Sequence, residues 1–462
     1  RAVFDKVPQP PPNHVHGKDK ITVYDDTNGD GTYDLHRDVL TGLNIVSAVA
    51  TGPGPNPSVG ENHGPTPSCH GIWVLYPPYL LVFPDADRDD VPDADPVVHL
   101  SGFGIEDTHS VANSLRWGPD GWLYGANGST STGNVSSAVT KNVRWEGQNI
   151  WRYHPDLRVF EIFAEGGGNT FSSEIDGKGR VFSGTNHGNT RGMYYPQGSY
   201  AEKNWGKHGP LTNPYAFGYF HHMRHEGDKD RFPQTFVIYE GGSLPKLFHQ
   251  NVIAANALHN RVWASEMMQD TSTYRTADRP AVVTTPDRWF RPVCVEVGPD
   301  GHVYIADWYD TRLSHVSPVD DWHKESGRIY RVIPSTSTPR YHEGDLSQRS
   351  VQELIKLFDH PNRWIRQRAA LEAGWRKDDS ATEQLVSLVD SGSLEALWTL
   401  NLMGQFTNGR ADRWLSGDSA DIRRWTVRLL GDRHTSRAGL VSLAKREQDV
   451  QVRSQLAATA KR

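Results

Sequence analysis

Cysteine is scarce in this sequence: its 462 residues include only Cys69 and Cys294. Two cysteines exclude a fold held together by a disulfide framework, and the residues alone leave open whether the two pair or stay free and buried. No C-x-x-C-H motif occurs, so this chain cannot attach a c-type haem.

Long apolar runs and an excess of positive charge are missing as well. No stretch approaches the ~18 consecutive apolar residues of a membrane-spanning helix. The formal net charge is -6, so the chain has no basic footprint and we expect no nucleic-acid partner. The sequence starts at Arg1 rather than at a methionine, so we expect any signal peptide or tether to have been removed already, and its absence here carries no information.

Several familiar catalytic motifs are absent. The sequence has no G-x-S-x-G motif and no cysteine in a nucleophile context, which argues against the common hydrolase chemistries. The glycine-rich run EGGGNTF (165–171) is not followed by a helical pattern, which excludes a phosphate-binding loop. The segment HHMRHEGD (221–228) lacks H-E-x-x-H spacing and leaves two interpretations open, metal ligands or a lid.

Glycine, proline and aromatic residues are abundant instead, with 43 Gly, 29 Pro, 15 Trp and 17 Tyr, as is typical of turn-rich all-β proteins. A unit of two extended segments around a turn recurs as LRWGPDGWLYGANG (115–128), SEIDGKGRVFSGTN (173–186), VEVGPDGHVYIADW (295–308) and a degraded copy, NVIAANALHNRVWASE (251–266). Repeated hairpins that cannot bury their own faces stack radially. The sequence therefore predicts a mainly β propeller of about six blades over residues 1–335.

A different pattern begins after the propeller region. Apolar residues recur at i, i+3, i+4 and i+7 in SVQELIKLFDHPNRWIRQRAALEAG (350–374), SLEALWTLNLMG (393–404), IRRWTVRLLGD (422–432) and VQVRSQLAATAKR (450–462). The recurrence, roughly every 30 residues, predicts a second domain over 345–462, an all-α HEAT-like solenoid.

Two aspartate-rich loops follow similar extended segments. DTNGDGTYD and DADRDDVPD place oxygen-bearing side chains at alternate positions, namely Asp26, Asn28, Asp30 and Asp34 in the first loop and Asp85, Asp87, Asp89 and Asp93 in the second. This spacing favours calcium, which prefers six to eight oxygen ligands, although neither loop has the glutamate that closes an EF-hand. The alternative is a solvated turn without a metal.

The hairpins bring polar side chains to one face. The start of the first strand and the end of the second lie at the same end of a hairpin, so His109 shares a face with Asn127. The other copies add Asn169, Asn186, His187, Asn256, His259, Trp289, Arg291, Asp307 and Asp310. In a propeller these ends surround the mouth of the central channel, and such a pocket suits a sugar or a planar anionic cofactor.

Roles can be assigned within this set. His109 is the first candidate for a general base, with His259 and Arg291 as the next catalytic candidates. The predicted cofactor-binding residues are Asn127, Asn169, Asn186, His187, Asn256, Trp289 and Asp307. The alternative for each residue is a structural role, because polar side chains at strand ends often only form local hydrogen bonds or cap turns.

Several segments together resemble one family. They are DTNGDGTYDLHRDVLTGL, GIWVLYPPYLLVF, GIEDTHSVANSLRWGPDGWLYGANG, NIWRYHPDLRVFEIFAEG, NPYAFG and DRWFRPVCVEVGPDGHVYIADWYD. Over nearly the whole chain they are similar to the membrane-bound dehydrogenase family of PVC-type bacteria. The resemblance implies export to the periplasm or cell surface. It also implies a propeller related to the quinoprotein glucose and sorbosone dehydrogenases, often followed by HEAT repeats.

The resemblance also implies a chemistry. A sugar or polyol would be oxidised by pyrroloquinoline quinone (PQQ) held over the channel mouth, with a histidine taking the hydroxyl proton and calcium polarising the cofactor. His109 is the implied base, although it lies one residue further from the turn than in those enzymes, where Ser110 now stands. Their quinone-contacting Arg-Asn-Pro segment is matched by Gly168-Asn169-Thr170, so the Asn carries over and the Arg does not.

Two further hypotheses remain open. One is a non-redox carbohydrate lyase or hydrolase that uses His109 or His259 as the base, with or without a metal. The other is a scaffold whose propeller binds a glycan or a protein and whose solenoid presents a second surface to a redox or protein partner.

Overall fold

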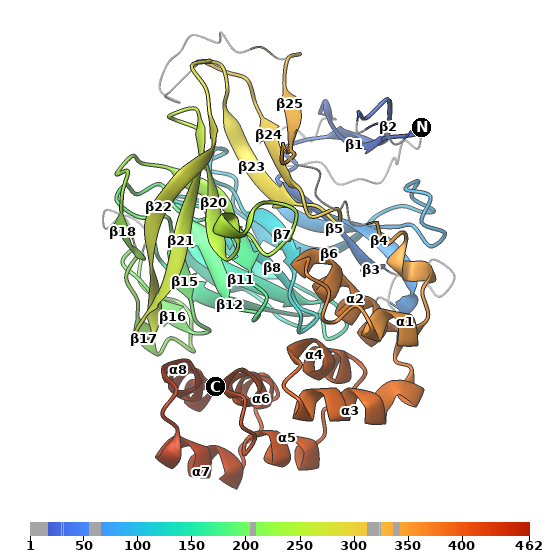
Figure 1. Ribbon diagram of the computed structural model, residues 1–462, viewed down its shortest axis with the longest axis vertical. Coiled ribbons are helices and arrows are strands. Elements are labelled where there is room, and N and C mark those ends of the chain that lie inside the picture. Colours follow the sequence, from blue (N-terminus) through green and yellow to red (C-terminus); the bar gives the residue numbers. More distant parts are fainter. Residues whose placement is uncertain are drawn as a thin grey trace.

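The computed structural model describes residues 17–28, 30, 32–54, 66–203, 209–311, 323, 325–335 and 342–462. Strands occupy the chain as far as Val332, and helices follow from Leu346 onward (Figure 1). The last described strand and the first helical turn lie on the two sides of the predicted domain boundary between 335 and 345. Among these residues no helix is long and apolar enough to cross a membrane. Cys69 and Cys294 are free thiols.

The strands form a series of sheets that follow one another along the chain. The first sheet pairs β1 (Asp19–Asp25) with β2 (Leu35–Leu43). The second, ordered β10-β9-β6-β5-β4-β3, contains β3 (Ala48–Gly54), β4 (Thr66–Tyr76), β5 (Tyr79–Pro84), β6 (Val97–Phe103), β9 (Thr132–Ser136) and β10 (Val143–Glu146). The third, ordered β17-β16-β12-β11-β8-β7, contains β7 (Asn113–Trp117), β8 (Leu123–Asn127), β11 (Asn149–His154), β12 (Val159–Glu165), β16 (Ser199–Tyr200) and β17 (Gly218–Tyr219).

Three more sheets complete the described part of the β-domain. The fourth, β13-β14-β15, contains β13 (Phe171–Ile175), β14 (Val181–Gly184) and β15 (Met193–Tyr195). The fifth, β18-β22-β21-β20-β19, contains β18 (Arg224–Glu226), β19 (Pro233–Ile238), β20 (Asn251–Asn256), β21 (Arg261–Asp270) and β22 (Thr273–Thr284). The sixth, β23-β24-β25, contains β23 (Pro292–Val297), β24 (Val303–Asp307) and β25 (Arg328–Val332).

The sheets are arranged like the blades of a propeller. The leading edge strands β3, β7, β13, β19 and β23 pack against one another in that order, and apolar side chains fill the space between neighbouring sheets. A many-stranded β-domain followed by a helical region is therefore confirmed. The number of blades stays a prediction.

Repeated turn chemistry explains why these hairpins form. In the G-P-D-G turns the second glycine has a left-handed backbone, with φ of +82° at Gly121 and +79° at Gly301. A tyrosine of the following strand donates to the turn aspartate, from Tyr124 to Asp120 at 2.8 Å and from Tyr304 to Asp300 at 2.9 Å. The same local sequence thus builds the same turn twice.

The degraded fourth copy has a different place from the one predicted. Residues 251–266 cover β20 and β21, the second and third strands of their sheet, because β19 precedes them as the leading strand. Asn256 ends β20 and His259 lies in the β20–β21 turn. Both therefore lie at the predicted end of the sheet, as parts of a turn that connects the second and third strands.

The helical region is a two-layered array. Its helices are α1 (Val351–Ile355), α2 (Arg363–Arg376), α3 (Thr382–Asp390), α4 (Leu394–Leu402), α5 (Asn408–Trp414), α6 (Ala420–Asp432), α7 (Ala438–Arg446) and α8 (Val450–Lys461), with short 3-10 helices η3 (Lys246–Phe248), η4 (Leu346–Gln348) and η5 (Asp379–Ala381) in the chain. Each even-numbered helix packs on the helix before it, and α2, α4, α6 and α8 form the row nearer the sheets (Figure 1). That this array is a HEAT solenoid stays a prediction.

The inner helix row docks on the turn end of the β-domain. Asn362 donates to Gly298 O (3.0 Å), and Trp425 donates to Lys178 O (2.8 Å). Arg428 donates to Asp120 at 2.8 Å. Because these contacts involve the G-P-D-G and D-G-K-G turns, the helices cover one end of the β-domain. The opposite end, where the leading strands start, is called the open face below.

Candidate functional site on the open face

The open face brings together the strand ends predicted from the hairpins. In the four sheets led by β7, β13, β19 and β23, the start of the leading strand pairs with the end of the second strand: Asn113 with Ala126, Phe171 with Gly184, Pro233 with Asn256, and Pro292 with Asp307. Neighbouring sheets are aligned, since Thr185 N donates to Pro233 O at 2.8 Å and Thr235 Oγ1 donates to Val293 O at 3.1 Å. These strand ends therefore lie at one end of the molecule.

Asn127 and Asn169 join the third and fourth sheets. The Asn127 side chain is fully buried, and its Nδ2 donates to the carbonyls of Ser131 and Gly147, each at 2.9 Å. Asn169 Oδ1 accepts from Ser129 N at 2.7 Å. Among the described residues, Asn169 Nδ2 makes no hydrogen bond. Asn127 thus supports the loop after β8, while Asn169 keeps a half-exposed donor.

A chain of hydrogen bonds continues to the fifth and sixth sheets. Asn169 N donates to Asn186 Oδ1 (3.1 Å), and Arg231 Nε donates to Asn186 O (3.2 Å). Asn256 Nδ2 donates to Arg231 O (3.2 Å), and Arg291 donates to the carbonyl of the residue after Asn256 at 2.5 Å. We call this continuous set, from Asn127 to Arg291, the polar belt.

His109 is the exposed imidazole at the start of the third sheet. Its side chain is 63% exposed, and its Nδ1 lies 3.6 Å from Asp107 Oδ1. The adjacent Ser110 is buried and donates to Asp107 Oδ2 at 2.7 Å. Burial acts to raise the pKa of Asp107, but hydrogen bonds from Thr130 and Ser110 outweigh it and hold the pKa below its usual value. An ionised Asp107 therefore lies beside His109, while Ser110 is engaged in the loop.

Position 128 has room only for a glycine. A Cβ on Gly128 would lie 2.4 Å from Ser110 O and 2.7 Å from Asn169 Oδ1. The residues around the first hairpin and the start of the fourth sheet are therefore packed closely together, next to His109.

The glycine-rich run places two histidines at the fourth sheet. Gly166, Gly167 and Gly168 have φ of +90°, +100° and +87°, and a Cβ on Gly168 would lie 2.7 Å from the His187 ring. His187 stacks on His222 with ring centroids 4.5 Å apart, and His222 Nε2 lies 2.7 Å from Gly167 O. Burial, and then the neighbouring His187, lowers the pKa of His222 to about 4. A pocket of about 320 Å³ opens beside these rings, lined by His187, Gly188, Asn189, Thr190, His222, Met223, Arg224 and His225.

His259 stands at the fifth sheet. Its Nδ1 lies 3.3 Å from Asn256 Nδ2 and 3.6 Å from Asp230 Oδ2. The buried Asn256 Oδ1 accepts from the backbone N of His259 at 3.0 Å, which fixes the turn. His259 is therefore a partly exposed imidazole next to a carboxylate, as His109 is.

The buried side chain of Arg291 links the fifth and sixth sheets through hydrogen bonds. Its guanidinium donates to Ala257 O at 2.5 Å and to Asp310 O at 2.6 Å, and its backbone N donates to Asp307 Oδ1 at 2.7 Å. Burial lowers the pKa of Arg291. Trp289 stacks on Tyr309 with ring centroids 5.7 Å apart. Arg291 and Asp307 are thus used internally, while Trp289 offers an aromatic surface.

Arg231 and His222 belong to this face although the sequence did not single them out. Arg231 is exposed, and among the described residues its terminal nitrogens form no hydrogen bond or ion pair. His222 lies in the connection from β17 to β18 and Arg231 in the connection from β18 to β19, where no strand periodicity predicts a position. The histidine-rich segment HHMRHEGD was the only sequence feature that pointed to His222, and no such feature pointed to Arg231.

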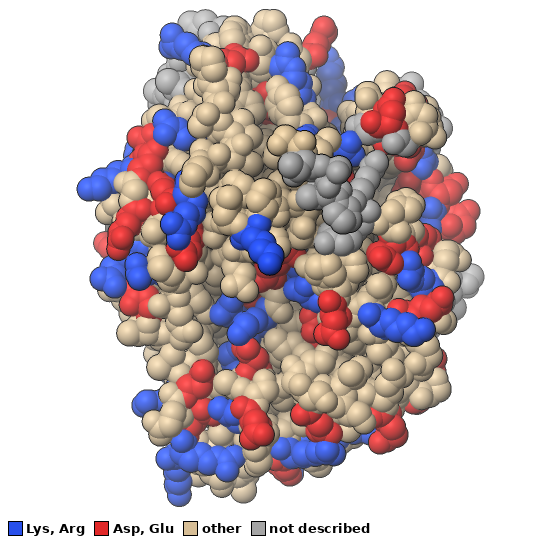
Figure 2. Space-filling view, viewed as in Figure 1, with Lys and Arg blue, Asp and Glu red and all other residues tan. Residues whose placement is uncertain are grey.

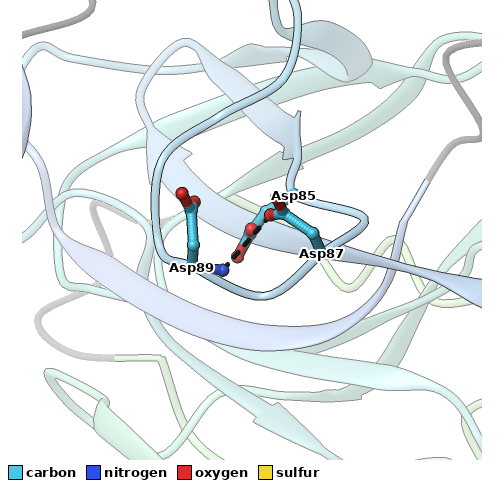
Figure 3. A group of neighbouring side chains, drawn as sticks. All are labelled: Asp85, Asp87 and Asp89. Carbon is cyan, nitrogen blue, oxygen red and sulfur yellow. Dashed lines mark hydrogen bonds between the residues drawn. The ribbon is translucent and has the colours of Figure 1, made fainter.

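One acidic group has the geometry of a metal site. Among the described residues, carboxylate oxygens of Asp85, Asp87 and Asp89 lie within 4.8 Å of one another (Figure 3). Burial, and then the neighbouring carboxylates, raises the pKa of Asp85 to about 6. Burial lowers the pKa of His70, whose Nδ1 lies 3.2 Å from Asp85 Oδ2, to about 4. Asp93 Oδ2 accepts from Ala86 N at 2.6 Å, outside this group.

The first aspartate-rich loop is organised differently. Asp30 accepts from Thr32 N at 2.6 Å, Asp34 accepts from Thr27 at 2.7 Å, and Asn28 Oδ1 accepts from Asp30 N at 2.8 Å. The carboxylates of Asp26, Asp30 and Asp34 form no close ligand group among the described residues, which leave out positions 29 and 31. Calcium in this loop stays a prediction.

The fold and the site together define a propeller-like β-protein with a polar belt on its open face and a helical array at its other end. The chain belongs to the family described as a domain of unknown function, DUF7133, whose model matches residues 7–336. A comparison with curated proteins found no match.

Solved structures with limited similarity include an aldose sugar dehydrogenase from Streptomyces coelicolor in its PQQ-bound form. It has 15% identity and a TM-score of 0.40, and the match covers 68% of this chain and 88% of that one. A glucose dehydrogenase-type oxidoreductase from Thermus thermophilus has 12% identity, a TM-score of 0.30 and coverage of 62% and 99%. A luciferin-regenerating enzyme has 10% identity, a TM-score of 0.31 and coverage of 58% and 75%. At these scores the function has to be argued from the residues of this chain.

Proposed function

We propose that this protein is an oxidoreductase that oxidises a hydroxyl group of a sugar or polyol at the open face, with PQQ as the electron acceptor. The observation that carries the proposal is the polar belt. It crosses the ends of four sheets, and the exposed histidines His109 and His259 and the cation Arg231 lie along it. The family resemblance of the hairpin segments implies the same cofactor class.

The residues present fit a planar anionic quinone. Its carboxylates need a cationic partner, and the exposed terminal nitrogens of Arg231 can supply one in place of the arginine missing before Asn169. Asn169 Nδ2 is a second donor, and Trp289 adds an aromatic face. Arg291 does not serve as this partner, because its guanidinium already donates to two backbone carbonyls.

His109 takes the proton from the substrate hydroxyl in this mechanism. Its Nδ1 faces Asp107, so Nε2 is the nitrogen that accepts the proton, and the ionised Asp107 stabilises the imidazolium that forms. A quinone held by Asn169 and Arg231 would supply the hydride acceptor for the alcohol carbon. Asn169 and Arg231 orient the bound molecules through hydrogen bonds. Under this proposal the protein acts in the periplasm or at the cell surface, and the outer helix row stays available to a redox or protein partner.

A titration combined with an activity assay tests the proposal. PQQ is titrated calorimetrically into calcium-loaded wild-type protein, His109→Ala and Arg231→Ala, and dye reduction is measured over a panel of sugars and polyols. We expect one-to-one binding by the wild type, with affinity lowered at least about tenfold in Arg231→Ala, because one charge-assisted contact is lost. His109→Ala should keep its affinity but lose sugar-dependent dye reduction by about 100-fold or more, the usual contribution of a general base.

The control is His434→Ala, an exposed histidine of the helical region, which should behave like the wild type. If the wild type binds no PQQ, the quinoprotein proposal is wrong. A panel of uronate- and glycoside-containing sugars, analysed for elimination and hydrolysis products, then separates the lyase or hydrolase from the scaffold.

A further inference from the structure

The second aspartate-rich loop lies away from the open face. Asp85 follows β5 directly, at the end of the sheet that the helices approach, and the loop returns to β6 after Asp93. Figure 3 shows Asp85, Asp87 and Asp89 along this single loop, with Asp87 reaching across to the backbone N of Asp89. The three carboxylates offer oxygens within 4.8 Å of one another, a spacing that one ion can bridge.

The buried member of this group is incompletely satisfied. The Asp85 side chain has no exposed surface, and its Oδ1 has no hydrogen-bond partner among the described residues. A buried carboxylate oxygen without a partner is costly, and native structures pair most such atoms with a protein donor, an ordered water or an ion. The orphaned oxygen of Asp85 belongs to the same group as the exposed carboxylates of Asp87 and Asp89.

The loop also connects three parts of the molecule. Arg37 of β2 donates to Asp89 O at 2.8 Å and to Asp90 at 2.5 Å. Arg88, with a left-handed φ of 62°, turns away from the carboxylates, and its guanidinium lies 3.8 Å from Glu372 of α2. The loop therefore adds polar contacts to both the β1–β2 hairpin and α2 beside the second sheet.

We propose that Asp85, Asp87 and Asp89 bind one Ca²⁺ and that the ion fastens the β1–β2 hairpin and α2 to the β-domain through Arg37 and Arg88. Calcium fits better than magnesium because the loop supplies three carboxylates and calcium tolerates an irregular set of oxygen ligands, whereas magnesium demands a near-ideal octahedron and keeps its waters. This site is independent of the proposed oxidoreductase activity, since it lies at the other end of the β-domain.

Calorimetry with calcium chloride tests binding in the full chain. The variants are Asp87→Asn with Asp89→Asn, both at exposed positions so that the fold is kept, and Asp90→Asn as the matched control, an acid of the same loop outside the ligand group. We expect the double variant to bind one Ca²⁺ fewer than the wild type and to lose the calcium-dependent rise in melting temperature. Asp90→Asn should retain the same number of ions as the wild type. Equal stoichiometry in the wild type and the double variant would overturn the site.

Hydrogen exchange tests the fastening. Calcium should slow amide exchange in α2 of the wild type, and Arg88→Ala should bind calcium with unchanged stoichiometry but show no slowing in α2. If calcium slows exchange in α2 equally in the wild type and in Arg88→Ala, the link through Arg88 is wrong. If calcium leaves exchange in α2 of the wild type unchanged, the fastening role itself is overturned. Neither result depends on PQQ or on a sugar.

Discussion

Some polar residues on the open face support the loops, and others keep polar atoms exposed to solvent. Asn127 and Arg291 have the right position for a binding site, but burial and backbone partners commit their side chains to holding loops together. His109 and Arg231 have the same neighbourhood and keep exposed polar atoms. Residue type and position along a strand therefore do not separate a ligand-binding side chain from a supporting one, because the difference lies in the partners supplied by other segments.

His222 gives a pH prediction at this scale. The pKa of His222 is about 4 in the folded protein and 6.5 in an unconstrained chain. Between these two values, the unfolded state therefore binds a proton at His222 and the folded state does not. The stabilisation is complete above pH 6.5 and is lost as the pH falls toward 4. We expect the melting temperature to fall over this window, and to fall less steeply in His222→Gln. Thermal scans at several pH values check this, with the exposed neighbour His221→Gln as the control. Parallel curves for wild type and His222→Gln would contradict it.

Secondary-structure elements follow local chemistry where a turn or cap signal is present. The G-P-D-G turns produce their hairpins, and Asn362, Ser393 and Ser419 cap the starts of α2, α4 and α6 with side-chain hydrogen bonds. The leading strand β19 carries no such signal, which is why the copy at 251–266 was assigned to the wrong pair of strands.

Asn362 both caps α2 and docks this helix on the β-domain. Its Oδ1 accepts from Trp364 N, and its Nδ2 donates to Gly298 O and Pro299 O on a turn of the β-domain. Asn362→Ala removes the cap and leaves Pro299 O without this donor at a buried position, while Gly298 O keeps its bond from Gly301 N, so we expect a loss of about 2–4 kcal/mol in unfolding free energy. Ser393→Ala removes a cap alone and should cost about 1 kcal/mol. Urea unfolding of both variants measures the difference, and equal losses would show that the contact with the turn contributes nothing.

At the scale of the whole molecule, buried ion pairs join the helices to the sheets. Arg152 of β11 pairs with Asp432 of α6 at 2.6 Å, and Arg363 of α2 pairs with Glu174 of β13 at 2.5 Å. Burial acts to raise the pKa of Asp432, but the charge and hydrogen bonds of Arg152 outweigh it and hold the pKa far below its usual value. On the face shown in Figure 2, exposed charges of both signs are interspersed, whereas the ion pairs of the junction are buried.

Breaking this junction should be costly. Asp432→Ala leaves the fully buried Arg152 guanidinium without its main partner, and we expect a loss of about 3–5 kcal/mol in unfolding free energy. The matched control is Asp412→Ala, which removes an exposed partner of Arg437 within the helical array and should change stability little. Chemical denaturation followed by tryptophan fluorescence compares the two, and a small loss in Asp432→Ala would show that the two parts are held by apolar packing instead.

Features that depend on neighbouring residues could be predicted from the amino-acid sequence. These are the hairpins with their Gly-Asp turns, the amphipathic helices, the change from strands to helices after about residue 335, and the alternate spacing of acids in the two aspartate-rich loops. Each follows from backbone preferences and side-chain periodicity over fewer than about 20 residues, which a sequence displays directly.

Contacts between distant segments became known only from the folded molecule. The two aspartate-rich loops have the same spacing, yet only Asp85, Asp87 and Asp89 converge among the described residues, because β4, β2 and α2 surround that loop and bury Asp85. The helices cover the turn end of the sheets and leave the other end open because Asp120, Lys178 and Gly298 meet α2 and α6 there. Such contacts join residues far apart in the chain, and their energies depend on burial and partner geometry that no local pattern contains.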